Sequence, residues 1–236
     1  MSSPWDALAD WYAPYRESAS SDNTAVEAPV IKRLLRKCAG LRILDVGCAA
    51  GYYTHWCATQ GAKAVGVDLS FNMLVKAIER RSGYSAAFVL ADAEGHIPFV
   101  DESFDIVLCS TLYRLVTEDE GLLSECCRVL KPGGRFILSD VHPLTHPIAR
   151  ARHTHTAPSS ASYFDRSPYA IRLQRQKITV WPRTVGDTIN AIVDAGFKIL
   201  SACEPRPANG AVAAGAAPGV DPCAVPYYLI IEAQRP

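Results

Sequence analysis

The sequence predicts an α/β domain with a mostly parallel sheet and helices on both faces. From about residue 42 onward, apolar runs of a few residues alternate with helical patterns, which is typical of β-α-β units. The chain has 236 residues, of which 49% are hydrophobic and 20% charged, so it is long enough to bury one sizeable core. We therefore expect one domain with additions rather than two domains.

Short apolar runs bounded by turn residues give the expected strands. These are RILDVG from residue 42, KAVGVDL from 63, AAFVLAD from 86, FDIVLCS from 104, GRFILSD from 134, FKILSACEP from 197 and PYYLIIEAQ from 226. Helices are expected over 52–59, 70–81, 118–130 and 184–195.

Local signals mark several element ends. Ser70 is a suitable N-cap, because its hydroxyl can accept a backbone N–H of the first helical turn. In LKPGG, from residue 130, the proline and glycines should end one helix and turn the chain into the next strand.

The chain divides into four expected regions. Residues 1–40 form N-terminal helices, 41–140 a core of alternating strands and helices, 141–182 an insertion of a length that usually serves binding, and 183–236 a helix and two strands. The Gly-, Ala- and Pro-rich stretch 207–226 is expected to be a flexible surface loop, with a lid as the alternative.

Composition limits the partners and the compartment. Lys plus Arg and Asp plus Glu both number 24, so no general attraction to nucleic acid or to an anionic membrane is expected. The eight cysteines show no C-x-x-C spacing, which favours a reducing compartment. Without a secretory signal pattern or a long apolar run, we expect a cytoplasmic protein.

Three successive predicted strands end in an acid. Asp45, Asp68 and Asp92 should lie along one edge of the sheet, where ligands bind in open α/β folds. Gly47 and Gly51 follow the first acid and allow a ligand to approach the backbone closely. The position of Asp68 suits an acid that accepts the two hydroxyls of a ribose.

The first acid separates two kinds of nucleotide ligand. A pyrophosphate would be repelled by Asp45 directly before the glycines, whereas an ammonium or sulfonium group would be attracted. This charge argument favours S-adenosyl-L-methionine over NAD or FAD.

The same stretches resemble a family. ILDVGCAAG, VGVDLS, LADAEGHIPFVDESFDIVLCS and ECCRVLKPGGRFILSD, within 42–140, are similar in order and spacing to the class I S-adenosylmethionine-dependent methyltransferases of the small-molecule type, methyltransferase type 11. The resemblance implies a Rossmann-like sheet of seven strands, the last of which inserts antiparallel. One departure is Ala49, where the family usually has glycine.

The resemblance also assigns cofactor-binding roles by position. The loop 45–51 would surround the methionine part, Asp68 the ribose, and Asp92 with Ala93 the adenine amino group. Leu69 and Met73 would line the adenine, with ordinary core packing as the alternative. Ser110 would lie near the amino-acid end, and Tyr12, in an aromatic N-terminal helix, would offer its hydroxyl to the cofactor carboxylate or merely pack.

Residues on the substrate side are predicted from their chain position and side-chain type. His142, two residues beyond the fifth strand, is a candidate general base, with a purely orienting role as the alternative. Candidates for the acceptor pocket are Tyr113, Arg114, His146, Tyr163, Phe164, Tyr169, Arg172 and Trp181. No metal site is expected, because prolines after His142 and His146 argue against a helix presenting both on one face.

We therefore expect methyl transfer from S-adenosylmethionine to a hydroxyl or amine of a small organic acceptor, in specialised metabolism for example. The alternatives are an RNA or protein methyltransferase, or a non-catalytic domain that keeps the cofactor site.

Overall fold

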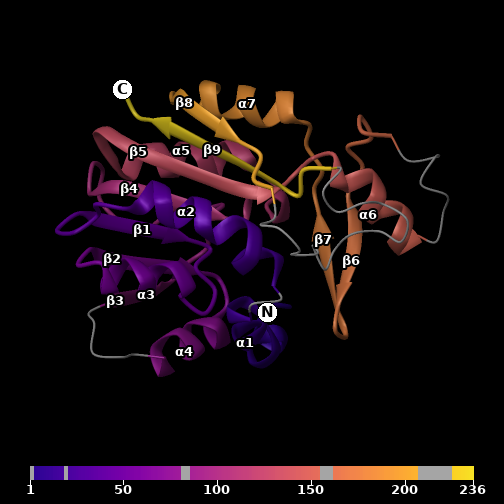
Figure 1. The fold of residues 1–236 in the computed structure, drawn as a ribbon, viewed down its shortest axis with the longest axis horizontal. Helices are drawn as coiled ribbons and strands as arrows, with labels where there is room; N and C mark the ends of the chain where they lie inside the picture. Colours follow the sequence, from indigo (N-terminus) through magenta and orange to yellow (C-terminus); the bar gives the residue numbers. More distant parts are fainter. Residues whose placement is uncertain (1–2, 19–20, 81–85, 155–161, 207–224) are drawn as a thin grey trace.

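Seven strands form one sheet in the order β3-β2-β1-β4-β5-β9-β8 (Figure 1). The computed structural model describes residues 3–18, 21–80, 86–154, 162–206 and 225–236. The strands are β1 (Arg42–Val46), β2 (Lys63–Asp68), β3 (Ala86–Leu90), β4 (Phe104–Ser110), β5 (Leu130–Val141), β8 (Lys198–Cys203) and β9 (Tyr228–Gln234). Neighbours among the first five are parallel, and β9 is antiparallel to both β5 and β8. The expected seven-stranded sheet with an inserted antiparallel last strand is confirmed.

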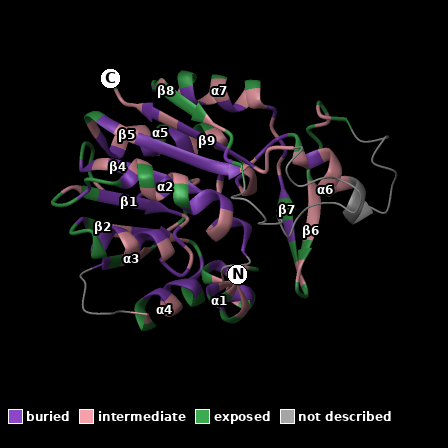
Figure 2. Ribbon diagram, viewed as in Figure 1, coloured by how far each residue is buried: buried purple, intermediate pink, exposed green. Residues whose placement is uncertain are grey.

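Alternate residues of the central strands face opposite helical layers. Ile43 and Ile106 pack with helices α2 (Ala28–Leu35) and α3 (Tyr52–Thr59). Leu44 and Val107 pack on the other face with α5 (Asp119–Val129) and α7 (Val185–Asp194). This period of two explains why the strands read as continuous apolar runs: both faces are buried (Figure 2).

The expected local signals are present. The Ser70 hydroxyl accepts the Met73 N–H at 3.2 Å and begins helix α4 (Phe71–Glu79). Helix α5 ends at Val129, and Gly133, with φ of 77°, lies in the irregular start of β5. Thr184 and Asp187 form a reciprocal capping box at the start of α7.

The N-terminal region is helical. It contains the 3-10 turn η1 (Asp6–Leu8), α1 (Ala9–Glu17) and the π-helix η2 (Asn23–Glu27). Leu8 and Ala9 pack with Met73 and with Ile178 of a separate hairpin, forming an apolar cluster beside the ends of the central strands.

The insertion contains structure that the sequence did not reveal. A 3-10 turn, η3 (Tyr113–Leu115), precedes it in the chain; within it lie α6 (Thr145–Thr154) and a two-stranded hairpin of β6 (Tyr169–Leu173) and β7 (Gln176–Val180). Figure 1 shows these elements beside the carboxyl ends of the strands. Helix α6 contains His146 but begins after His142, so it does not present both histidines on one face; Pro147 is accommodated in its first turn, where no intrahelical N–H is needed.

Residues 207–224, most of the expected surface loop, lie outside the described part of the chain. Among the described residues, no helix is both long and apolar enough to cross a bilayer.

Candidate functional site

A cavity lies at the carboxyl ends of β1, β2, β3 and β4, under the N-terminal helices. Its lining includes most of the predicted cofactor-binding residues, namely Tyr12, Gly47, Asp68, Leu69, Met73, Asp92, Ala93 and Ser110. The chain order separates these residues widely, and the parallel sheet brings them to one edge. Trp5, from the aromatic N-terminal segment, completes the apolar part of the wall together with Leu112 and Leu115, which were not predicted from the sequence.

A smaller cavity adjoins the first one. Tyr12, Gly47 and Ser110 line both, and the smaller cavity adds Asp45, Arg16, Tyr53 and Arg80. Among the described residues, the buried Tyr53 hydroxyl has no hydrogen-bond partner. A buried polar atom at such a wall indicates room for a polar ligand group.

Asp45 is buried at the end of β1. One carboxylate oxygen accepts hydrogen bonds from the Thr54 N–H at 3.1 Å and the Thr54 hydroxyl at 2.6 Å. Desolvation raises the pKa of Asp45 to about 6, although the Thr54 bonds and the charge of Arg16 oppose the shift. A nearby cation would therefore stabilise its ionised form.

Gly51 lies behind the cavity rather than in its wall. It has φ of 73° and precedes α3, and a Cβ at this position would lie 2.8 Å from the Phe88 ring. Its role in the described structure is thus to let the chain turn against the sheet.

Ala49 adopts a left-handed conformation, with φ of 47°. Its N–H donates to Asp68 Oδ2 at 2.8 Å, so the loop is held against the predicted ribose-binding acid. This is the conformation that favours glycine, the residue that the family usually has at this position.

We expect Ala49→Gly to raise the free energy of unfolding by about 1 kcal/mol. Relief of the left-handed conformation, about 1–2 kcal/mol, exceeds the entropy that glycine adds to the unfolded chain. Cofactor affinity should change by less than about 1 kcal/mol, since glycine keeps the N–H to Asp68. Urea unfolding measures the first effect; the control Ala50→Gly, at an ordinary φ, should lower stability. A destabilised Ala49→Gly variant would contradict the argument.

Asp68 is half-buried and holds two backbone groups. Its Oδ1 accepts the Ser70 N–H at 2.8 Å, and its Oδ2 accepts that of Ala49. Burial raises its pKa against the effect of these hydrogen bonds. A carboxylate oxygen can accept more than one hydrogen bond, so Asp68, which lines the cavity, can also receive ribose hydroxyls.

A buried polar network joins the N-terminal region to the sheet. Glu27, with 0% exposure, accepts the hydroxyls of Ser110 and Ser139 at 2.6 Å each on Oε1. Its Oε2 accepts Asn23 at 3.1 Å and Arg16 at 3.3 Å. The network fixes the Ser110 side chain at the cavity wall. Neither Arg16 nor Glu27 was predicted from the sequence, because Glu27 bonds Ser110 and Ser139, which lie 83 and 112 positions away, and no local signal marks such contacts.

Four of the predicted substrate residues line a third, small cavity: Tyr113, Arg114, His146 and Trp181. Arg114 forms an ion pair with Asp140 at 2.5 Å, and its N–H donates to the same carboxylate at 2.7 Å. The remaining four lie outside this wall: Tyr163 accepts the Val185 N–H, Tyr169 contacts His146, and Arg172 and Phe164 are exposed.

His146 is a buried, neutral imidazole. Its Nδ1 lies 3.0 Å from the Tyr169 hydroxyl, and burial together with the charges of Arg114 and Arg150 lowers its pKa to about 3. The side chain of His153 and the whole of His155 lie outside the described part of the chain.

The general-base role expected for His142 does not fit the geometry. His142 is 1% exposed and lines none of the three cavities. Its Nδ1 accepts the Leu144 N–H at 3.1 Å, so the Nε2–H donates to Glu204 at 2.9 Å. Neither nitrogen is left to take a proton from an acceptor, and burial lowers the pKa of the ring.

The polar and apolar groups on the two cavity walls fit S-adenosylmethionine. In the larger cavity, Asp68 and Asp92 provide acceptors for a nucleoside, and Leu69 and Met73 provide apolar contacts. In the smaller cavity, Asp45 suits a cationic group, and Arg16 and Arg80 suit a carboxylate.

Comparisons with known proteins agree with this geometry. The family model described as a methyltransferase domain matches residues 44–138. The chain is 31% identical to a demethylmenaquinone methyltransferase of Clavibacter sepedonicus over 77% of this chain and 76% of that protein. It is 32% identical to the demethylmenaquinone methyltransferase of Tropheryma whipplei strain Twist over 63% of this chain, and the matched part spans only 63% of that protein.

Among solved structures, a Listeria monocytogenes protein assigned to the S-adenosylmethionine-dependent methyltransferases superposes with a TM-score of 0.74. It is 25% identical, and the match covers 89% of this chain and 98% of the other.

Proposed function

We propose that this chain, which belongs to the class I S-adenosylmethionine-dependent methyltransferases, transfers a methyl group to a hydroxyl or amine of a small organic acceptor. One observation carries the proposal: Asp45, Asp68 and Asp92 lie around connected cavities at one edge of the sheet. A cationic nucleoside ligand suits these acids better than a pyrophosphate does.

The chain contributes binding and orientation. When bound, S-adenosylmethionine supplies an activated methyl group on a sulfonium. Asp68 and Asp92 would hold its nucleoside, Asp45 would face its cationic part, and Ser110, fixed by Glu27, would meet its amino-acid end. The N-terminal helices and the β6–β7 hairpin would exclude water from the acceptor.

The surroundings of the cavity favour an apolar acceptor. Trp5, Trp11 and Tyr12 pack in the cluster that also contains Ile171 and Leu173 of the hairpin. Relatives that act on demethylmenaquinone support a ring-bearing acceptor for this chain. We propose a planar, mostly apolar molecule with one nucleophilic hydroxyl or amine.

Calorimetry and an acceptor screen test this function. The purified chain should bind S-adenosylmethionine and S-adenosylhomocysteine but not NAD. Aromatic phenols and amines should then gain the mass of one methyl group, with apolar compounds without a hydroxyl or amine as controls. Tighter binding of NAD would overturn the cofactor assignment, and binding without any methylated product would favour the non-catalytic alternative.

One observation favours a second candidate, methylation of RNA. Arg172 and Lys177 are exposed and directly opposite each other on the hairpin, with Arg175 at its turn. None of the ion pairs found among the described residues includes these three cations, and like charges facing each other across strands are destabilising. Activity on RNA that falls steeply with salt would support this candidate, and salt-insensitive activity on small acceptors would dismiss it.

Cofactor affinity should depend on the ionisation of Asp45. Its pKa of about 6 in the free protein should fall when a cationic ligand binds, so the complex holds fewer protons. Affinity for S-adenosylhomocysteine is thus expected to rise as pH increases through about 6 and to level off above about 7. Calorimetry between pH 5 and 8 measures this, and Asp45→Asn should remove the rise. A wild-type affinity that falls over this range would contradict the assignment.

His142→Ala should retain more than about a third of wild-type turnover on an acceptor from the screen. The ring has no free nitrogen, so the change removes support for the segment after β5 rather than a base. The melting temperature should fall, because the Leu144 N–H and Glu204 lose their partner. A loss of turnover of about 10²-fold or more at unchanged cofactor affinity would restore the base role.

A further inference from the structure

The part of the cavity wall that would bind adenine belongs to a segment without regular secondary structure. Ala91, Asp92, Ala93 and Glu94 line the wall, and residues 91–103 between β3 and β4 form neither helix nor strand. A wall of this kind positions a ligand only if other parts of the protein fix its backbone.

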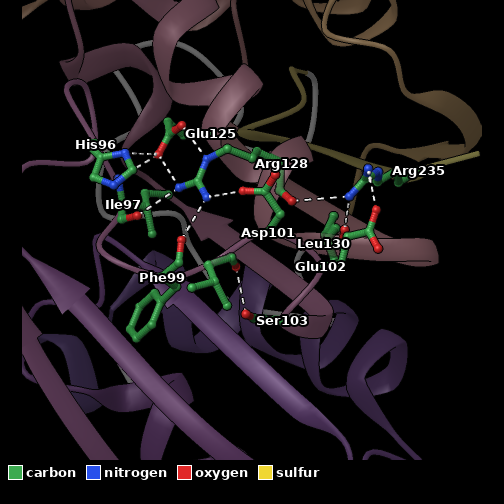
Figure 3. Close-up of polar contacts among 11 residues, drawn as sticks. His96, Ile97, Phe99, Asp101, Glu102, Ser103, Glu125, Arg128, Leu130 and Arg235 are labelled. Atoms are coloured by element: carbon green, nitrogen blue, oxygen red, sulfur yellow. Dashed lines mark hydrogen bonds and ion pairs between the residues drawn. The ribbon is translucent and has the colours of Figure 1, made fainter.

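Hydrogen bonds with residues near both ends of helix α5 hold this segment. Near the start of the helix, Glu94 Oε2 accepts the N–H groups of Thr117 and Glu118 at 2.8 and 3.1 Å. Near its end, Arg128 donates to the carbonyl oxygens of Ile97 and Phe99 at 2.9 and 2.7 Å (Figure 3).

Arg128 uses all five of its N–H donors. Besides the two carbonyls, its guanidinium donates to both oxygens of Glu125 and to Asp101, at 2.7 Å each. Glu125 in turn accepts the Ile97 N–H at 2.8 Å. Figure 3 shows Arg128 between the helix and the segment. The hydrogen bonds that Arg128 donates to Glu125 lower the pKa of Glu125, so the pair stays charged at neutral pH.

Lysine could not replace this arrangement. An ammonium has three donors and lacks the planar fork that reaches two carbonyls and a carboxylate at once. The contacts therefore require arginine for a geometric reason, beyond its charge.

We propose that Arg128 is a positioning residue for the adenine end of the cofactor site. Through Ile97 and Phe99 it sets the backbone that carries Asp92 and Ala93 against the adenine amino group. The inference rests on the proposed cofactor. It predicts that Arg128 controls selectivity for adenine, although its side chain does not line the cavity.

The test compares two ligands that differ at the adenine amino group. S-adenosylhomocysteine carries this group, and S-inosylhomocysteine has an oxygen in its place. Calorimetry gives the ratio of their dissociation constants. The wild type should favour the adenine ligand about tenfold or more, on the scale of a hydrogen bond to a charged group.

Arg128→Lys and Glu125→Gln should reduce this ratio to less than about threefold, mainly by weakening the adenine ligand. Amide exchange should become faster over 91–99 than elsewhere. The control is Arg235→Lys, since Arg235 donates to the Arg128 and Leu130 carbonyls and to Glu102 but does not contact residues 91–99. In Arg235→Lys, the ratio of the two dissociation constants should match that of the wild type. The melting temperature should fall about as much as in Arg128→Lys and Glu125→Gln.

Two results would overturn the proposal. A ratio within twofold of wild type in both folded variants would make Arg128 merely structural, while leaving the proposed function intact. A wild-type protein that binds neither ligand would reject the proposed function together with this inference.

Discussion

Glu27→Ala is expected to lower the free energy of unfolding by about 3–5 kcal/mol, the range for breaking one side of a buried ion pair. The substitution leaves the Arg16 guanidinium buried without its carboxylate, and it removes the acceptor of Ser110 and Ser139. The cation–π contact of Arg16 with the Tyr52 ring, 4.2 Å from the guanidinium carbon to the ring centroid, does not replace a negative charge. Urea unfolding followed by circular dichroism measures the change.

A double-mutant cycle with Arg16→Met separates the pair from the rest of the network. The double variant should lose less stability than the sum of the single variants, because neither charge is then left alone. Asp10→Asn, in an exposed ion pair with Lys76, serves as the control and should change little. If the losses in the free energy of unfolding of the two single variants simply add in the double variant, the buried pair has no interaction energy.

Asp68→Ala is expected to weaken S-adenosylhomocysteine binding by about 30- to 150-fold, or about 2–3 kcal/mol. The carboxylate would receive the ribose hydroxyls, and it also fixes the loop at Ala49 and the turn at Ser70. Calorimetry at pH 7.5, well above the ordinary carboxyl pKa, keeps ionisation out of the comparison.

Asp105→Ala is the matched control for this substitution. Asp105 also bonds a backbone N–H, that of Arg42, and pairs with Lys131, but it lies at the start of β4, away from the cavity. Asp105→Ala should lower the free energy of unfolding and leave the affinity for S-adenosylhomocysteine within about twofold of the wild type. An unchanged dissociation constant in Asp68→Ala would show that the ribose assignment is wrong.

Much of the sheet and its acidic edge could be predicted because their signals are local. Each strand is an apolar run; Asp45 and Asp68 lie at the ends of β1 and β2, and Asp92 lies two residues after β3. Once the strands are parallel, the acids must meet at one edge. The cavity was thus predictable without knowledge of the long-range packing.

The hairpin and the buried network had no comparable signal. The turn between β6 and β7 contains Gln174 at φ of 52° rather than glycine or asparagine, so the usual mark of a hairpin is absent. Glu27 meets Ser110 and Ser139 only after the N-terminal helices dock on the sheet. For His142, the position just beyond β5 suggested a general base, but both ring nitrogens are occupied by hydrogen bonds with Glu204 and the Leu144 N–H.

The place of β9 in the sheet has a consequence for biosynthesis. This strand follows all the others in the chain, yet it inserts between β5 and β8 and pairs with both along nearly its whole length. While the chain emerges from the ribosome, β5 therefore keeps an unpaired edge until residues 228–234 are available. During synthesis, β1 to β4, whose carboxyl ends form the cofactor site, can pair early, but the edge of β5 stays unpaired until β9 has emerged. The nascent chain is therefore most exposed to edge-to-edge aggregation just before β9 pairs with β5.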